Sequence, residues 1–147
     1  MNSAVLVAWL HYVSLMLMTA SLLAEHLLLK PQPTLEQAKT LQVLDIIYGV
    51  AATALLITGI ARMFLEKGTD YYLHHAPFHI LLTLFVLIGL LSIYPTVKFL
   101  KWRQTTRAGQ APVLAAGDYR RLQMFMRAEL TLLFIAPLFA AWMARGV

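Results

Sequence analysis

The stretch PFHILLTLFVLIGLLSIYPTVKFL, which runs from Pro77 to Leu100, decides the fold class. It carries one charged side chain, Lys98, close to its end. As an α-helix it would be roughly 36 Å long, enough to cross the ~30 Å hydrocarbon core of a bilayer. A helix also satisfies its backbone hydrogen bonds internally, as lipid requires. We therefore expect a transmembrane helix here.

Three other segments have the same character: Ala4–Leu29, Leu41–Phe64 and Leu122–Met143. The chain of 147 residues is 60% hydrophobic and 13% charged, whereas about a quarter of the residues in a soluble domain are charged. The first segment lacks a positively charged start and is too long for a signal peptide, so we expect it to be retained. The sequence predicts a single domain, residues 1–147, folded as an all-α four-helix bundle in the membrane.

Positive charge is distributed unevenly between the two sides of this bundle. The loops after the first and third segments carry eight lysines and arginines, namely Lys30, Lys39, Lys98, Lys101, Arg103, Arg107, Arg120 and Arg121. The other side carries Arg62, Lys67 and Arg145. The positive-inside rule therefore places both termini on the periplasmic side of a bacterial inner membrane. The net charge of +5 is explained by insertion and by anionic headgroups, so we expect no nucleic-acid partner.

The stretch from Trp102 to Tyr119 contains Gly109, Pro112 and Gly117 and is expected to be a flexible cytoplasmic loop. The absence of cysteine excludes disulfides, thiolate haem ligands and cysteine-ligated iron–sulfur clusters. No phosphate loop or nucleotide fingerprint is present, so kinase and dehydrogenase activities have no support.

Histidines gather where the third segment begins, in YYLHHAPFHI, and His11 lies inside the first segment. Ionisable groups at that depth usually face a bundle interior, a cavity or a cofactor. Because the first and third segments run in the same direction, His11 and His79 are expected in the same leaflet. A haem with two histidine ligands needs imidazoles on facing helices, so this pair predicts a haem b site. The alternative is that His11 is a neutral imidazole bonded to a neighbouring helix.

Other groups near this outer end admit two interpretations each. Arg62 has the forked donor geometry that suits haem propionates, or it extends to the membrane surface. His75 lies four residues before His79 and could bind copper or zinc with it. His74 is expected to be solvated, whereas His26 lies at the opposite end of its segment, at headgroup level.

A polar set is expected at the cytoplasmic ends of the helices. Its members are Glu25 and His26, Asp45 and Tyr48, and Arg127 and Glu129. Glu25 shares a seven-residue stripe with His11 and Met18, which predicts that the stripe faces the interior. Both signs of charge are present, so ion pairs across helices are expected to offset the desolvation cost. The set could be a proton path, a quinone headgroup site or a structural clasp.

Nearly the whole chain resembles a family of bacterial membrane proteins described as a domain of unknown function. The resemblance is carried by WLHYVSL, DIIYGVAATALLITGIAR, KGTDYY, the third segment through KWR, and AAWMARG. That family is similar, more distantly, to membrane proteins of the copper-resistance type and to the haem-dependent protoporphyrinogen oxidase. The resemblance implies a haem ligand at His11. The lysine expected early in the third helix has no equivalent, since residues 80–83 are Ile, Leu, Leu and Thr.

These observations predict a redox-active inner-membrane protein that binds haem b through His11 and His79, with Arg62 at the propionates. Such a protein would exchange electrons with quinone or a redox protein, or would oxidise a porphyrinogen as an oxidoreductase. A cofactor-free accessory or transport protein is one alternative. A periplasmic-side copper or zinc site, built from His74, His75 and His79, is another.

Overall fold

The structure, a computed structural model, describes residues 2–146. Within that range every regular element is a helix, which confirms the all-α prediction. The helices are α1 (Ser3–Leu28), α2 (Leu35–Leu65), α3 (Thr69–Leu73), α4 (Ala76–Lys101), α5 (Arg103–Arg107) and α6 (Ala116–Arg145). Four spans in the described chain are long and apolar enough to cross a membrane: α1, α2, α4 continued through α5, and α6.

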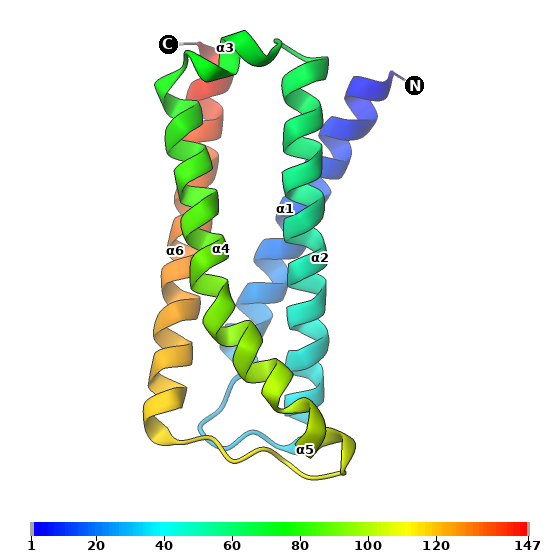
Figure 1. Cartoon of the computed structure of the whole chain (residues 1–147), viewed down its shortest axis with the longest axis vertical. Helices are drawn as coiled ribbons and strands as arrows, with labels where there is room; N and C mark the ends of the chain where they lie inside the picture. The colour runs from blue at the N-terminus through cyan, green and yellow to red at the C-terminus, as the bar shows by residue number, and fades with distance from the viewer. Residues whose placement is uncertain (1, 147) are drawn as a thin grey trace.

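The four long helices form two pairs. The most extensive packing joins α1 to α2 and α4 to α6, while α1 with α6 and α2 with α4 pack less extensively. Both chain ends lie at the end of the bundle that carries α3, and α5 lies at the opposite end (Figure 1). We refer to these as the termini end and the α5 end. The distribution of positive charge predicts that the α5 end is cytoplasmic.

Local signals in the sequence determine where α2 and α4 begin. α2 starts at Leu35 because Thr34 forms a capping box with Gln37: the Thr34 side chain accepts from the Gln37 amide, and the Gln37 side chain accepts from the Thr34 amide. α4 begins with Pro77 in its first turn, as predicted, where a missing N–H costs nothing. Pro95 lies in the second half of α4, which runs obliquely toward α2 in Figure 1.

The segment from Trp102 to Tyr119 is packed against the bundle, which corrects the expectation of a flexible loop. It contains α5 and the first turn of α6, and the side chains of Trp102, Thr106 and Leu114 are buried. Side-chain amides tie it down: Gln32 Nε2 donates to Leu114 O at 3.1 Å, and Gln42 Nε2 donates to Thr106 Oγ1 at 3.3 Å. Apolar burial and these bonds outweigh the glycines and the proline that suggested mobility.

Burial is concentrated in the half of the bundle nearer the α5 end. The buried residues of α1 begin at Ser14, and those of α6 end at Leu133. On α4, no residue between Pro77 and Ile88 is buried. The two helix pairs accordingly stand apart toward the termini end in Figure 1, where α3 connects them. The tightly packed half is therefore where side chains from several helices are brought together.

Candidate functional site

Acidic side chains from three helices meet in the packed half of the bundle. Glu25 on α1 and Glu129 on α6 are each 1% exposed, Tyr48 on α2 is 4% exposed, and Asp45 on α2 is 9% exposed. We call these four residues the carboxyl cluster. Glutamate is almost never this deeply buried unless it is paired. Two fully buried glutamates in one cluster are therefore unusual for a folded protein.

Helical periodicity explains why these residues face inward. Glu25 follows Met18 by seven residues, and Met18 is also 1% exposed, so the predicted inward stripe is confirmed at these two positions. On α6 the buried residues Leu122, Met126, Glu129 and Leu133 follow the spacing of one helix face. Glu129 thus occupies a core position that an apolar residue would ordinarily hold.

Two hydrogen bonds fix part of the carboxyl cluster. Tyr48 Oη donates to Glu129 Oε2 at 2.9 Å, and Thr96 Oγ1 on α4 donates to Asp45 Oδ1 at 2.9 Å. Glu25 interacts electrostatically with both Asp45 and Glu129. The other oxygen of Glu129, Oε1, is buried and has no hydrogen-bond partner in the protein, and the same is true of Glu25 Oε1. A buried polar atom without a protein partner usually marks bound water, an ion or a functional role.

The predicted ion pairs within this set are wrong. Arg127 is exposed and lies on another face of α6 from Glu129. The ion pairs found among residues 2–146 are Lys39–Glu36, Arg62–Glu66 and Lys98–Asp118, and none of them includes a member of the carboxyl cluster. Because Arg127 is exposed, it does not reach the buried carboxyl groups of the other helices, Glu25 and Asp45, with which an ion pair across helices was expected.

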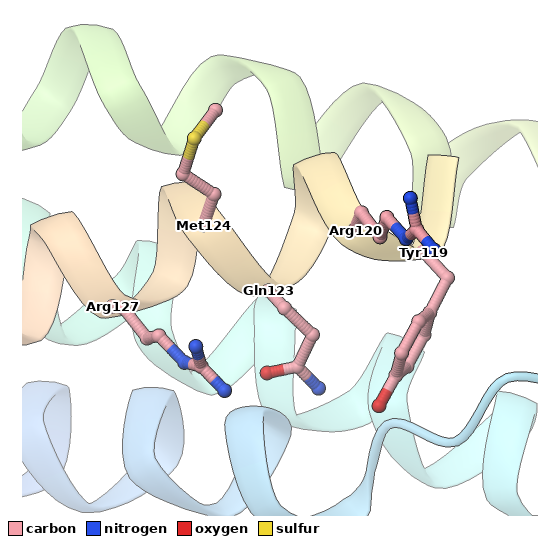
Figure 2. Close-up of a pocket in the computed structure, with 5 residues that line it drawn as sticks. All are labelled: Tyr119, Arg120, Gln123, Met124 and Arg127. Atoms are coloured by element: carbon pink, nitrogen blue, oxygen red, sulfur yellow. The ribbon is translucent and has the colours of Figure 1, made fainter. Parts of the chain in front are cut away.

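A basic hollow of about 330 Å³ lies on α6 at the α5 end. Its lining residues are Tyr119, Arg120, Gln123, Met124 and Arg127 (Figure 2). The Gln123 Nε2 group donates to the carbonyls of His26 and Leu29, which ties α6 to the end of α1. Gln123 Oε1 and His26 Nδ1 are buried without a protein partner, as are the free oxygens of Glu25 and Glu129.

Sequence reasoning missed Gln123 and Thr96. Each lies among other polar residues of its helix, so nothing in the sequence singled it out. Their partners are 94 and 51 residues away in the chain, so spacing along one helix could not have revealed them.

His11 is half-buried between α1 and α2. Its Nδ1 lies 3.0 Å from Thr58 Oγ1, and the Thr58 hydroxyl donates to Ala54 O at 2.7 Å. Because a hydroxyl has one hydrogen to give, this arrangement makes His11 Nδ1 the donor and leaves Nε2 with a free lone pair. Gly59 makes room for the ring, since a Cβ at that position would lie 3.3 Å from His11 Cε1.

The histidines at the start of α4 bond to nearby backbone. His74 Nδ1 lies 2.8 Å from Asp70 O, His75 Nδ1 lies 2.6 Å from Tyr71 O, and His79 Nε2 lies 2.8 Å from Leu73 O. Residues 2–146 contain no group of three His, Cys, Asp or Glu side chains placed to hold a metal ion. His79 is exposed, and α1 and α4 make no close backbone contact within the described chain.

Arg62 is engaged by Glu66, one turn later. The guanidinium donates to both carboxylate oxygens, Nε at 2.6 Å and Nη2 at 3.2 Å, and it also lies over the Tyr12 ring. These hydrogen bonds hold the pKa of Glu66 below its ordinary value. Tyr72 donates to the same carboxylate, and burial raises the pKa of Tyr72.

Comparison with known proteins gives a family. The family model described as "Predicted membrane protein (DUF2214)" matches residues 3–147. The chain belongs to this family. No curated protein and no solved structure matches the chain.

Membership of DUF2214 agrees with the four membrane-spanning helices and with the predicted family resemblance. The description of the family states a membrane protein and no activity. The more distant similarity to copper-resistance proteins and to the haem-dependent oxidase is not shown by these comparisons.

Proposed function

We propose that this membrane protein takes up and releases a proton at the carboxyl cluster, as one step of a proton-coupled redox or transport reaction. The burial of Glu25 and Glu129 without a bonded cation carries the proposal. An unpaired carboxylate in an apolar interior costs several kcal/mol or more, and binding a proton removes that cost. Ionisable residues inside membrane-spanning segments are rare, and they mark proton relays and ion pathways in many pumps and transporters.

The neighbouring groups suit proton exchange. Tyr48 bonds one oxygen of Glu129, so a hydroxyl and a carboxyl are already in contact. The buried side-chain nitrogen and oxygen atoms without a hydrogen-bond partner belong to Glu25, Glu129, His26 and Gln123. Gln123 also lines the basic hollow at the α5 end. These acceptors extend from the bundle interior to that surface. A structural clasp, in which the carboxyl groups only hold the helices together, is the competing interpretation.

Infrared spectroscopy of the detergent-purified protein at neutral pH tests the proposal. A protonated carboxyl group has a C=O stretching band that a carboxylate lacks. We expect such a band, its reduction in Glu25→Gln or Glu129→Gln, and its prompt shift to lower frequency in D₂O. Glu36→Gln is the matched control, since the Glu36 side chain is 84% exposed and should leave the band unchanged.

The D₂O result separates proton exchange from a structural clasp. A band that stays unshifted means a proton locked in place and overturns the proposal. A wild-type spectrum without the band, or one that neither glutamine variant changes, overturns it as well.

A second candidate function is haem b binding by His11, and one observation favours it. The Thr58 hydroxyl of the neighbouring helix holds His11 Nδ1, which the alternative without haem also predicts, and this bond leaves Nε2 free to bind a metal. Bound haem would supply one-electron chemistry. His79 would have to exchange its bond with Leu73 O, and Arg62 its bonds with Glu66, to serve as predicted.

An absorption spectrum of the purified protein, oxidised and then reduced with dithionite, tests this second candidate. Haem binding predicts a Soret band with sharp reduced α and β bands, lost in His11→Ala and retained in the exposed control His74→Ala. Loss in His79→Ala would identify the second ligand. A colourless protein from cells supplied with haem contradicts haem binding by this protein.

Quinone or a redox protein remains the predicted electron partner of such a haem protein.

A further inference from the structure

The basic hollow on α6 has the chemistry of a lipid headgroup site. One face of α6 presents Arg120, Gln123 and Arg127, because Gln123 is three residues after Arg120 and four residues before Arg127. Seven residues separate the two arginines, or roughly 10 Å along the axis. No acidic side chain lines the hollow, and neither arginine belongs to an ion pair within residues 2–146.

Gln123 shows that the hollow is more than an exposed basic stripe. Its side chain is 9% exposed, and its Nε2 donates to His26 O at 3.3 Å and Leu29 O at 3.4 Å. Those two bonds fix which end of the amide is oxygen. Oε1 is buried without a partner and lies on the side of the amide that faces Arg127 in Figure 2. A buried acceptor in this state requires a donor, such as a hydroxyl group.

The apolar lining indicates an amphiphile. Met124 is 60% exposed beside the arginines, and the Tyr119 ring forms another wall. The hollow also lies at the end of the bundle that the positive-inside rule places in the cytoplasm, where anionic lipids attract basic side chains. Guanidinium groups bind phosphate with paired hydrogen bonds, which ammonium groups do not provide.

We propose that this hollow binds the headgroup of an anionic phospholipid with a hydroxyl-bearing headgroup, as in phosphatidylglycerol. Arg120 and Arg127 bind the phosphate, a headgroup hydroxyl donates to Gln123 Oε1, and an acyl chain lies along Met124. The hollow shares Gln123 with the row of unpartnered groups in the proposed function, but lipid binding requires no proton exchange, so the lipid and infrared experiments test the two proposals separately.

Native mass spectrometry of the full chain tests the site. The detergent-purified protein is incubated with equal amounts of phosphatidylglycerol and phosphatidylcholine, and bound lipid is counted for each species. We expect preferential retention of phosphatidylglycerol, and a loss of about fivefold for each of Arg120→Gln and Arg127→Gln. Gln123→Leu should reduce the preference for phosphatidylglycerol over phosphatidic acid, which has no headgroup hydroxyl.

Arg121→Gln is the matched control, because Arg121 is an exposed arginine next to the site that does not line the hollow. An equal loss in Arg121→Gln would mean a diffuse surface charge and would overturn the proposal. Equal retention of phosphatidylcholine would also overturn it. A third arm adds soluble glycerol phosphate: displacement of the lipid at similar concentration would assign the hollow to a free phosphate compound and not to lipid.

Discussion

Tyr48 on α2 donates a 2.9 Å hydrogen bond to Glu129 on α6, 81 residues further along the chain. Both side chains are buried, at 4% and 1% exposure, and the bond links the two helix pairs of the bundle. In an interior of low dielectric such a bond is strong, and losing either partner leaves a desolvated polar group behind. The contact therefore matters both to the proposed proton site and to the association of the helices.

Tyr48→Phe tests this contact directly. The substitution keeps the ring and removes the donor, so Glu129 loses its hydrogen-bonding partner in the interior. We expect the free energy of unfolding in detergent to fall by about 1–3 kcal/mol. Tyr94→Phe is the control, since the Tyr94 hydroxyl makes a longer, part-buried bond of 3.4 Å to Asp118. Equal effects of the two substitutions would show that burial does not strengthen the Tyr48 bond.

The pocket for His11 depends on the absence of a side chain at residue 59. Alanine at Gly59 would place its Cβ 3.3 Å from His11 Cε1, whereas alanine at Gly49 would meet nothing within 4 Å. Gly49→Ala should raise the free energy of unfolding by about 0.5–1 kcal/mol through helix propensity. Gly59→Ala should raise the free energy of unfolding by less than Gly49→Ala does, or lower it, because the imidazole ring of His11 must move. Equal gains would mean that His11 shifts without cost.

The capping box at Thr34 makes a local prediction. Thr34→Ala removes the side-chain acceptor for the Gln37 amide and should cost about 1 kcal/mol of unfolding free energy. Thr40→Ala serves as control, because the exposed Thr40 hydroxyl bonds only the Glu36 carbonyl one turn back in the same helix. Chemical or thermal denaturation measures both variants. A Thr34→Ala protein as stable as wild type would show that packing alone begins α2.

The bond between Arg62 and Glu66 predicts loss of stability in acid. The pKa of Glu66 is lower in the folded protein than in the unfolded chain, so the folded state is favoured above the unfolded pKa. That contribution disappears as the pH falls through the lowered folded pKa. Glu66→Gln should be less stable than wild type at neutral pH, with the difference shrinking below about pH 4. Thermal midpoints measured across that range provide the check, and a difference independent of pH would contradict the assignment.

The predicted orientation is open to a labelling experiment because the chain contains no cysteine. Asp70→Cys lies at the termini end and Gln110→Cys at the α5 end, and both positions are exposed. In intact cells, a maleimide that does not cross membranes should label residue 70, and it should label residue 110 only after permeabilisation. The reverse pattern would place the termini in the cytoplasm and would contradict the positive-inside prediction.

Much of the fold was predictable because lipid leaves few choices. Long apolar segments must become helices there, so Pro77–Leu100 alone predicted α4 closely, and the first-turn role of Pro77 followed from its missing N–H. The helix α2 begins at Leu35, before the predicted span Leu41–Phe64, because a capping box starts it in a polar first turn. The packing of Trp102 and Leu114 was missed because glycine and proline indicate turns but do not reveal what a turn packs against.

The four helices and the inward stripe through Met18 and Glu25 could be read from the sequence, because hydrophobicity and the 3.6-residue period act along a single chain. The sequence also placed Glu25, Asp45, Tyr48 and Glu129 near the same end of the bundle. Which of these side chains are in contact became visible only in the folded structure. It gave Glu129 a hydrogen bond from Tyr48 where ion pairs across helices were expected, and it placed Arg127 in the lining of the hollow beside Gln123. Those contacts depend on how helices rotate about their axes and which ones adjoin, and these are set by packing between segments far apart in the chain.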